Sequence, residues 1–297
     1  MPKEIIAKSI LNKSKRRDPW FLDDYSMNFY SGCSFNCLYC YIHGSKYGTH
    51  MEKSLGVKVN ALELLERQLY NKSKKGQQGI IALSSASDPY LQFEKDYQLT
   101  RGALELILKY KFPVHIITKS DLVERDFDLL NEIDKQAIIP AELRSKLKRG
   151  TILTFSFSSV DDRINKIFEP GATIPSKRLN TLEKAVDHGL LSGVSMMPLL
   201  PYITDTTASL NEMYSAFKTV GANYVMPASI TLFGHESSDS RTLVFRAVEK
   251  HFPELLPKYQ KLLGTNVYMP SYYVKAFVKK MKELAVEYNV PDRIIYL

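Results

Sequence analysis

The sequence predicts an α/β protein built as a partial (β/α)6 barrel with a helical C-terminal cap. Apolar runs of strand length alternate with segments of helical periodicity, and this alternation stops near residue 230. Parallel neighbouring strands need a crossover of helical length, so the regular alternation indicates a parallel sheet. At 297 residues the chain is long enough to bury a substantial core around such a sheet.

The alternation can be followed element by element. Six apolar segments predict strands at residues 27–31, 79–83, 114–118, 151–156, 192–198 and 224–228. The segments between them predict helices at residues 60–70, 100–109, 126–133, 177–187 and 209–220. Beyond the last strand the alternation ends, and further helices are expected at residues 240–251, 257–263 and 272–288.

These elements suggest three parts along the chain. Residues 1–25 are mixed and rich in lysine, and we expect an arm that lies across the barrel surface. Residues 26–230 contain the six strand and helix units and form the predicted barrel. Residues 231–297 form the predicted cap, which packs on the barrel as an extension of it.

The composition is that of a folded protein, with 44% hydrophobic and 24% charged residues. No apolar run reaches the roughly 18 residues that span a bilayer, and no signal peptide is recognisable, so the expectation is a cytoplasmic protein without membrane contact. Lys and Arg number 40 against 32 Asp and Glu, which gives a formal net charge of +8. This excess makes nucleic acid a candidate partner, although the basic residues form several separate clusters.

All three cysteines lie in one short string, GCSFNCLYCY, with the spacing C-x3-C-x2-C at Cys33, Cys37 and Cys40. A disulfide-stapled protein would spread an even number of cysteines along the chain, so a local metal site is indicated. Three thiolates on a cubane iron–sulfur cluster would leave one iron without a protein ligand, where a cofactor can coordinate. The alternative is a structural zinc site with His43 as the fourth ligand.

This string, with an aromatic residue before the third cysteine, resembles the signature of the radical S-adenosylmethionine (SAM) superfamily. The resemblance implies a six-stranded partial barrel, a [4Fe-4S] cluster on the three cysteines, and SAM chelating the open iron. An electron from the reduced cluster would then cleave SAM to a 5'-deoxyadenosyl radical that abstracts hydrogen from a substrate. Tyr39 and Tyr41 flank the last cysteine, and Tyr39 is expected beside the cofactor.

A closer resemblance, over about residues 10–230, is to the family that includes spore photoproduct lyase. It rests on the strings SASDPY at 85–90, LTRGALELI at 99–107, ITKSDLVERD at 117–126, FSFSSVD at 155–161 and FEPGA at 168–172. In that family polar residues at strand ends bind SAM, which implies roles for Ser87, Asp88 and Lys119. Lys119 would pair with the methionyl carboxylate, and Ser156, or its competitor Ser158, would bond the same group.

The sequence departs from the DNA-repairing members of that family. They return a hydrogen atom to the substrate from a cysteine just before the Ser-Asp pair, where this chain has Ser84, Ser85 and Ala86. We therefore expect a radical SAM enzyme of lyase or oxidoreductase type on an unknown substrate, with an external electron donor such as flavodoxin or ferredoxin. Three alternatives remain: a nucleic-acid repair lyase, a noncatalytic nucleic-acid-binding protein with a zinc loop, and a barrel that keeps the cluster without turnover and senses iron or oxygen.

Overall fold

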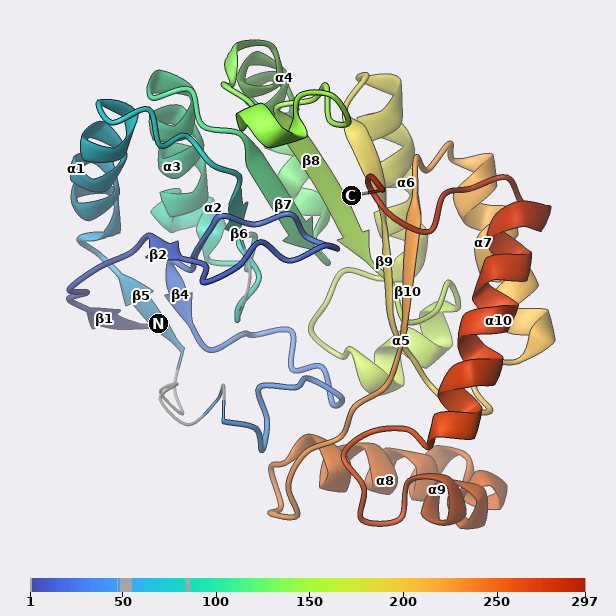
Figure 1. Cartoon of the computed structure of the whole chain (residues 1–297). Helices are drawn as coiled ribbons and strands as arrows, with labels where there is room; N and C mark the ends of the chain where they lie inside the picture. Colours follow the sequence, from blue (N-terminus) through green and yellow to red (C-terminus); the bar gives the residue numbers. More distant parts are fainter. Residues whose placement is uncertain (1, 47, 49–54, 84–85, 297) are drawn as a thin grey trace.

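A sheet of six parallel strands forms the centre of the protein (Figure 1). The computed structural model describes residues 2–46, 48, 55–83 and 86–296. The sheet runs in the order β10, β9, β8, β7, β6, β3, with β2 added antiparallel at the β3 edge. Its strands are β2 (Asn12–Lys13), β3 (Tyr25–Met27), β6 (Ile81–Leu83), β7 (Val114–Thr118), β8 (Thr151–Ser156), β9 (Leu191–Leu199) and β10 (Val225–Ser229).

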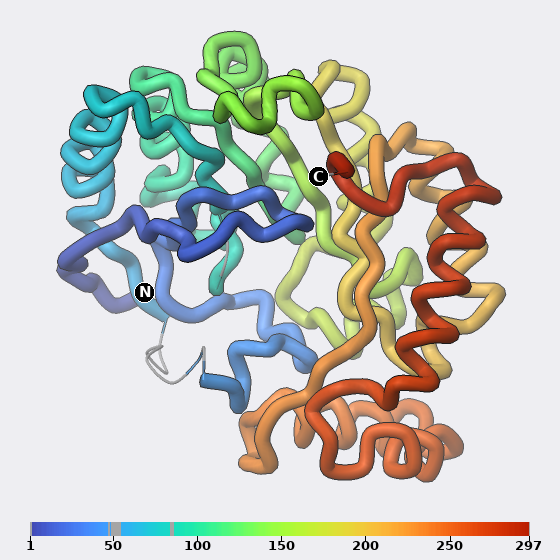
Figure 2. The backbone as a smooth tube through the Cα atoms, in the orientation of Figure 1, coloured from blue at the N-terminus to red at the C-terminus, as the bar shows by residue number. Residues whose placement is uncertain are grey.

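Helices connect consecutive parallel strands, as the alternation predicts (Figure 2). The longer crossover helices are α1 (Ala61–Ser73), α3 (Leu99–Lys109), α4 (Phe127–Gln136), α6 (Pro175–Asp187) and α7 (Thr207–Thr219). Short helices α2 (Glu94–Tyr97), η1 (Asp121–Asp126), η2 (Ala141–Leu143) and α5 (Asp162–Phe168) fill the connections. All six residues of β8 are buried, as expected for a strand covered on both faces. The predicted fold class is confirmed.

The first strand differs from its prediction. Residues 27–31 do not form one strand: β3 ends at Met27, and the chain leaves the main sheet before β4 (Tyr30–Ser31). Strand β4 instead pairs with β5 (Gly56–Lys58), which also pairs with β1 (Lys3–Ile5) in a separate three-stranded sheet. These strands are two or three residues long and therefore carry too little periodicity to be recognised in the sequence.

The N-terminal segment packs against the end of the sheet at which the parallel strands begin. Leu22 is fully buried in an apolar cluster with Ile80, Ile152 and Tyr224. Hydrogen bonds from the Tyr25 and Asp24 backbone amides to the Ile80 carbonyl continue this contact. The opposite end, where the strands finish, is thereby left to the loops that carry the cysteines and the other polar residues of interest.

Three helices follow the last strand: α8 (Ser240–His251), α9 (Leu256–Leu263), with the short η3 (Pro253–Leu255) before it, and α10 (Ser271–Glu287). Helix α10 packs against β10, and α8 packs against α9 and α5 (Figure 1). A second apolar cluster, which includes Tyr39, Phe168, Leu200 and Tyr259, joins α8 and α9 to the cysteine loop. Among the described residues no helix is long and apolar enough to cross a membrane.

Candidate cofactor site

The three cysteines lie on a loop that follows β4 directly. Gly32 opens this loop at φ +75°, a left-handed conformation that glycine adopts without steric cost. Asn36, at φ +49°, turns the chain again between the first two cysteines, and asparagine tolerates this region better than most residues. The Cys40 amide donates to the Cys37 carbonyl at 3.1 Å, so the last two cysteines share one tight turn.

The segment that contains FEPGA is joined to the cysteine loop by backbone hydrogen bonds. The Leu38 amide donates to the Phe168 carbonyl at 2.9 Å, and the Gly171 amide donates to the Phe35 carbonyl at 3.0 Å. A Cβ atom at Gly171 would lie 2.2 Å from the Ser34 carbonyl oxygen. The close approach of the two backbones therefore requires glycine at this position, which gives a physical reason for part of the string.

The three thiols are free and partly buried. Burial raises the pKa of Cys33 to about 12, with a further contribution from Asp88, and burial also raises the pKa of Cys37 and Cys40. Thiolates at these positions need compensating positive charge, which a bound metal centre supplies. Soft thiolate ligands suit iron–sulfur clusters.

The described residues contain no group of three or more His, Cys, Asp or Glu side chains placed to hold a single metal ion. A zinc ion needs all of its ligands to converge on one point. A cubane cluster is less demanding, because each thiolate binds a different iron atom. Among the described residues, a convergent zinc site that includes His43 is therefore not preformed.

A buried carboxylate, Glu169, lies directly behind the cysteine loop. Its Oε1 accepts hydrogen bonds from the Tyr39 hydroxyl and from Ser158 Oγ, the latter at 2.7 Å. Its Oε2 accepts from Asn165 Nδ2 and from Arg178 Nη2, both at 2.7 Å. Glu169 and Arg178 are both fully buried and form a buried ion pair, in which Arg178 Nε is without a hydrogen-bond partner among the described residues.

Lys119 follows the end of β7 and faces the same carboxylate. Its Nζ lies 3.7 Å from Glu169 Oε1 and 5.9 Å from the centre of the Tyr39 ring, and 13% of its side chain is exposed. Burial alone would raise the pKa of Glu169, but the Arg178 and Lys119 cations outweigh it and lower this pKa to about 2. The carboxylate is therefore ionised, and the site carries two cations and one anion.

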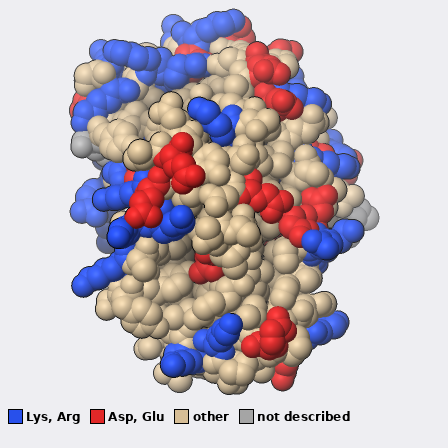
Figure 3. Space-filling view, turned by 90° about the vertical axis from the view of Figure 1, so that its right-hand side faces the viewer, with Lys and Arg blue, Asp and Glu red and all other residues tan. Residues whose placement is uncertain are grey.

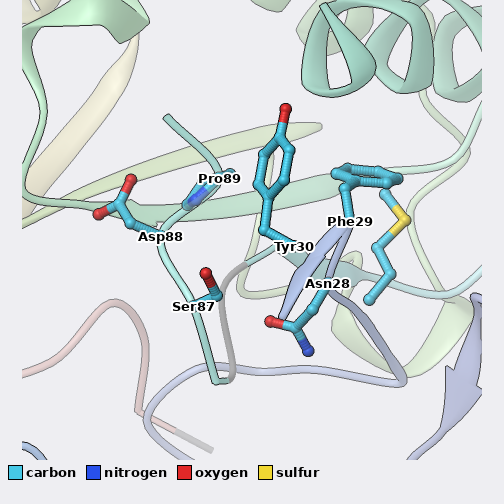
Figure 4. Close-up of a pocket in the computed structure, with 7 residues that line it drawn as sticks. Asn28, Phe29, Tyr30, Ser87, Asp88 and Pro89 are labelled. Carbon is cyan, nitrogen blue, oxygen red and sulfur yellow. The ribbon is translucent and has the colours of Figure 1, made fainter. Parts of the chain in front are cut away.

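Asp88 and Ser87 lie between the cysteine loop and β7, in a narrow pocket lined in part by Asn28 (Figure 4). Asp88 accepts hydrogen bonds from Thr118 Oγ1 at 2.8 Å and from the Lys119 amide at 2.8 Å. Burial raises the pKa of this carboxyl group. Ser87 Oγ donates to the Gly32 carbonyl at 2.6 Å, so these two side chains tie the β6 connection to β7 and to the cysteine loop.

Ser156 and Ser158, the two competing serines at the end of β8, have different surroundings. Ser158 Oγ is engaged by Glu169, and Ser158 is almost fully buried. The Ser156 carbonyl accepts a hydrogen bond from Arg178 Nη1. Ser156 is 9% exposed, against 1% for Ser158. Of the two serines, Ser158 is thus the one whose hydroxyl is bound to Glu169, and Ser156 is the more accessible one.

The structure gathers the predicted residues Tyr39, Lys119 and Ser156 around one buried charged cluster, with Asp88 next to it. Sequence reasoning missed its centre, Glu169, and the cation Arg178. Glu169 is part of the string FEPGA, but this string was used only as a whole, as one of the strings that carry the family resemblance. A glutamate before a proline and a glycine gives no indication by itself that its carboxylate is buried.

Comparison with known proteins identifies the family to which this chain belongs. The model of the radical SAM superfamily matches residues 27–213. An uncharacterised protein of Mycobacterium tuberculosis is 26% identical over 294 residues, covering 97% of this chain and 81% of its own. An uncharacterised protein of the archaeon Methanocaldococcus jannaschii is 30% identical over 195 residues, covering 63% of this chain and 65% of its own.

Solved structures agree on the fold. A cysteine-to-serine mutant of spore photoproduct lyase superimposes with a TM-score of 0.63 at 13% identity, covering 96% of this chain and 78% of that one. A further mutant of that lyase, with bound AdoMet and dinucleoside spore photoproduct, gives 0.62 at 15% identity over the same shares. Since the family model spans more than half of the sequence, the chain belongs to the radical SAM superfamily and is an enzyme of that class.

Proposed function

We propose that this protein binds a [4Fe-4S] cluster through Cys33, Cys37 and Cys40 and uses it to cleave SAM reductively. When bound, the cluster and SAM together supply a 5'-deoxyadenosyl radical that abstracts hydrogen from a substrate. The observation that carries the proposal is the arrangement of three thiols on one loop near the Lys119 cation, with Ser156 at the end of the neighbouring strand β8. An external one-electron donor, such as flavodoxin or ferredoxin, would reduce the cluster.

Each nearby residue has a role that suits its surroundings. Lys119 would bind the SAM carboxylate, because its ammonium is partly exposed and its contact with Glu169 is longer than a close ion pair. The Ser156 hydroxyl would donate to the same carboxylate. Tyr39 would contribute its ring, since its hydroxyl is bound to Glu169.

Asp88 and Ser87 have backbone groups as partners, and their roles follow from this. Asp88 accepts from two backbone amides and one hydroxyl, which leaves its carboxylate little capacity for the ribose or amino group of SAM. We propose that Asp88 and Ser87 act on SAM mainly by fixing the backbone around Lys119 and Gly32. Direct contact with SAM is a smaller part of their role.

The proposal is tested by anaerobic reconstitution of the full chain, with iron and sulfide analysis and an assay for 5'-deoxyadenosine from SAM under dithionite. We expect about four irons per chain and measurable cleavage. In Cys37→Ala we expect loss of cleavage, since one of the three cysteine-bound irons then lacks its ligand. Stoichiometric zinc in place of iron, with no cleavage, would exclude the proposal and favour the zinc-loop alternative.

A nucleic-acid repair lyase is the second candidate, favoured by the net charge of +8 and by the fold shared with spore photoproduct lyase. Two observations weigh against it. All three cysteines of the sequence lie in the cysteine loop, so no thiol is left to return hydrogen; Ser84 and Ser85 lie outside the described residues. Figure 3 shows one face on which Lys and Arg are interspersed with Asp and Glu. Salt-dependent, lesion-specific DNA binding would favour this candidate.

A further inference from the structure

The Glu169 carboxylate connects parts of the chain that are far apart in the sequence. Its Oε1 takes the hydroxyl of Tyr39, from the cysteine loop 130 residues earlier, and the hydroxyl of Ser158, which follows β8. Its Oε2 takes Arg178 from helix α6. One buried group therefore joins the loop that carries the cysteines to the strand ends that carry the expected SAM contacts.

The two oxygens of Glu169 face different surroundings. Oε2 accepts from Arg178 and Asn165, so the Arg178 cation lies on this side of the carboxylate. Oε1 faces the cysteine loop and Lys119. Because Lys119 Nζ is 3.7 Å away, against 2.7 Å for Ser158, the carboxylate holds this cation nearby without binding it tightly.

We propose that Glu169 is a positioning residue that fixes the cysteine loop, through Tyr39, at a set distance from Lys119. That distance matters because SAM would have to bind the open iron while its methionyl carboxylate also reaches Lys119. The inference rests on the proposed function, since it assigns the loop and Lys119 to the same bound SAM. It assigns no contact between Glu169 and SAM.

The loop has further attachments, which make the proposal specific. Backbone hydrogen bonds at Leu38 and Gly171 hold the same loop against the residues around Glu169. The Tyr39 hydroxyl is the side-chain attachment that reaches the charged cluster itself. Its removal should therefore leave the loop bound but loosened, and cluster assembly should survive.

Two variants test this, because each removes one donor to the same oxygen. Tyr39→Phe keeps the ring, so any contact of the ring with SAM is retained, and Ser158→Ala removes a donor outside the cysteine loop. SAM affinity is measured by equilibrium dialysis on the reconstituted chain. Amide exchange at Leu38 and Gly171 is measured on the iron-free chain. Tyr224→Phe, at the far end of the strands, is the control for loss of a buried tyrosine hydroxyl.

For Tyr39→Phe we expect unchanged iron content, SAM affinity reduced about tenfold, and faster exchange at Leu38 and Gly171, because a hydrogen bond to a charged acceptor is lost. Tyr224→Phe should leave loop exchange unchanged and SAM affinity within about threefold of wild type, and Ser158→Ala should leave loop exchange unchanged. Wild-type affinity and exchange in Tyr39→Phe, or equally accelerated loop exchange in Ser158→Ala, would overturn the inference.

Failure of the proposed function would look different. A wild-type chain that assembles no cluster overturns the proposed function, and it overturns the inference with it, because Lys119 and the loop would then share no SAM. A wild-type chain that cleaves SAM, combined with an unaffected Tyr39→Phe variant, leaves the proposed function standing and removes the role of Glu169. Amide exchange in the iron-free chain separately reports whether Tyr39 anchors the loop.

Discussion

Two buried polar networks involve strands β7 and β8, and they differ in charge. Within the sheet, His115 Nδ1 contacts the Phe21 carbonyl at 2.8 Å and Nε2 contacts Thr154 Oγ1 at 2.6 Å, while Thr154 also bonds the Tyr224 hydroxyl at 2.7 Å. Burial lowers the pKa of His115 to about 4, so this network is neutral at pH 7. Beyond the strand ends, the other network contains the ionised Glu169 with two cations.

The difference separates a structural network from a functional one. The neutral network satisfies its polar groups by hydrogen bonds and fastens the N-terminal segment to the sheet. Burying charges costs desolvation energy that apolar packing would avoid, so a buried charged network is weak evidence for stability alone. Barrel enzymes place ligands at the carboxyl ends of strands and use the other end for stability, and the two networks follow this division.

The largest expected effect comes from removing the charge at the centre of the site. Glu169→Ala should lower the free energy of unfolding by about 3–5 kcal/mol, because Arg178 is left buried and unpaired. Thr154→Val removes a neutral hydrogen-bonding group from the other network and should cost about 1–3 kcal/mol. Denaturant unfolding of the two variants measures both. Equal losses would mean that charge does not distinguish the networks energetically.

A pH titration of stability sharpens the comparison. The pKa of His115 is lowered from 6.5 to about 4, so the unfolded chain binds a proton that the folded chain does not. Stability from this group is complete above pH 6.5 and is lost as the pH falls towards 4, by roughly 3 kcal/mol at most. The Glu169 pKa is lowered from 4.5 to about 2, so its contribution persists above pH 4.5 and disappears only towards pH 2.

Urea midpoints measured between pH 7 and pH 4 test this order. His115→Gln should be less stable at pH 7 and should show a flatter dependence between pH 6.5 and pH 4 than the wild type. If the slope in this range is the same in His115→Gln, other groups cause it. Protonation of His115 would then not be what lowers stability as the pH falls.

The smallest effect on stability, and a specific effect on function, is expected at Lys119. Lys119→Met removes the loosely held cation, so SAM affinity should fall at least about tenfold while iron content stays near wild type and the unfolding midpoint falls less than in Glu169→Ala. Lys184→Met, at a surface lysine paired with Glu124, is the matched control and should leave SAM affinity unchanged. Equal SAM binding by Lys119→Met and wild type would remove Lys119 from the site.

Sequence reasoning succeeded where the signal is local. The runs VHIIT and TILTFS have the length and β-branched content of buried strands, and β7 and β8 have the predicted bounds. Cysteine spacing likewise identified the loop that the family comparison supports. Strand β5 was missed and β4 was merged with β3 into one predicted strand, because the pairing of β4 with β5 depends on distant segments and not on their own composition.

The centre of the charged network was missed for a related reason. Glu169 meets Tyr39 across 130 residues, and only the folded chain shows that this glutamate is buried and bound to Arg178. Expected contacts at Asp88 and Ser87 were placed near the site, but the structure shows their side chains bound to backbone groups. A single sequence gives residue types at strand ends and does not give the partners that compete for them.

The most direct test of the central claim is the electron paramagnetic resonance spectrum of the reduced, reconstituted wild-type chain, recorded with and without SAM. If the three cysteines leave one iron open and Lys119 helps to bind SAM there, saturating SAM will change the cluster signal. A cluster signal that saturating SAM leaves unchanged, or a chain that assembles no cluster and retains zinc, would contradict the account.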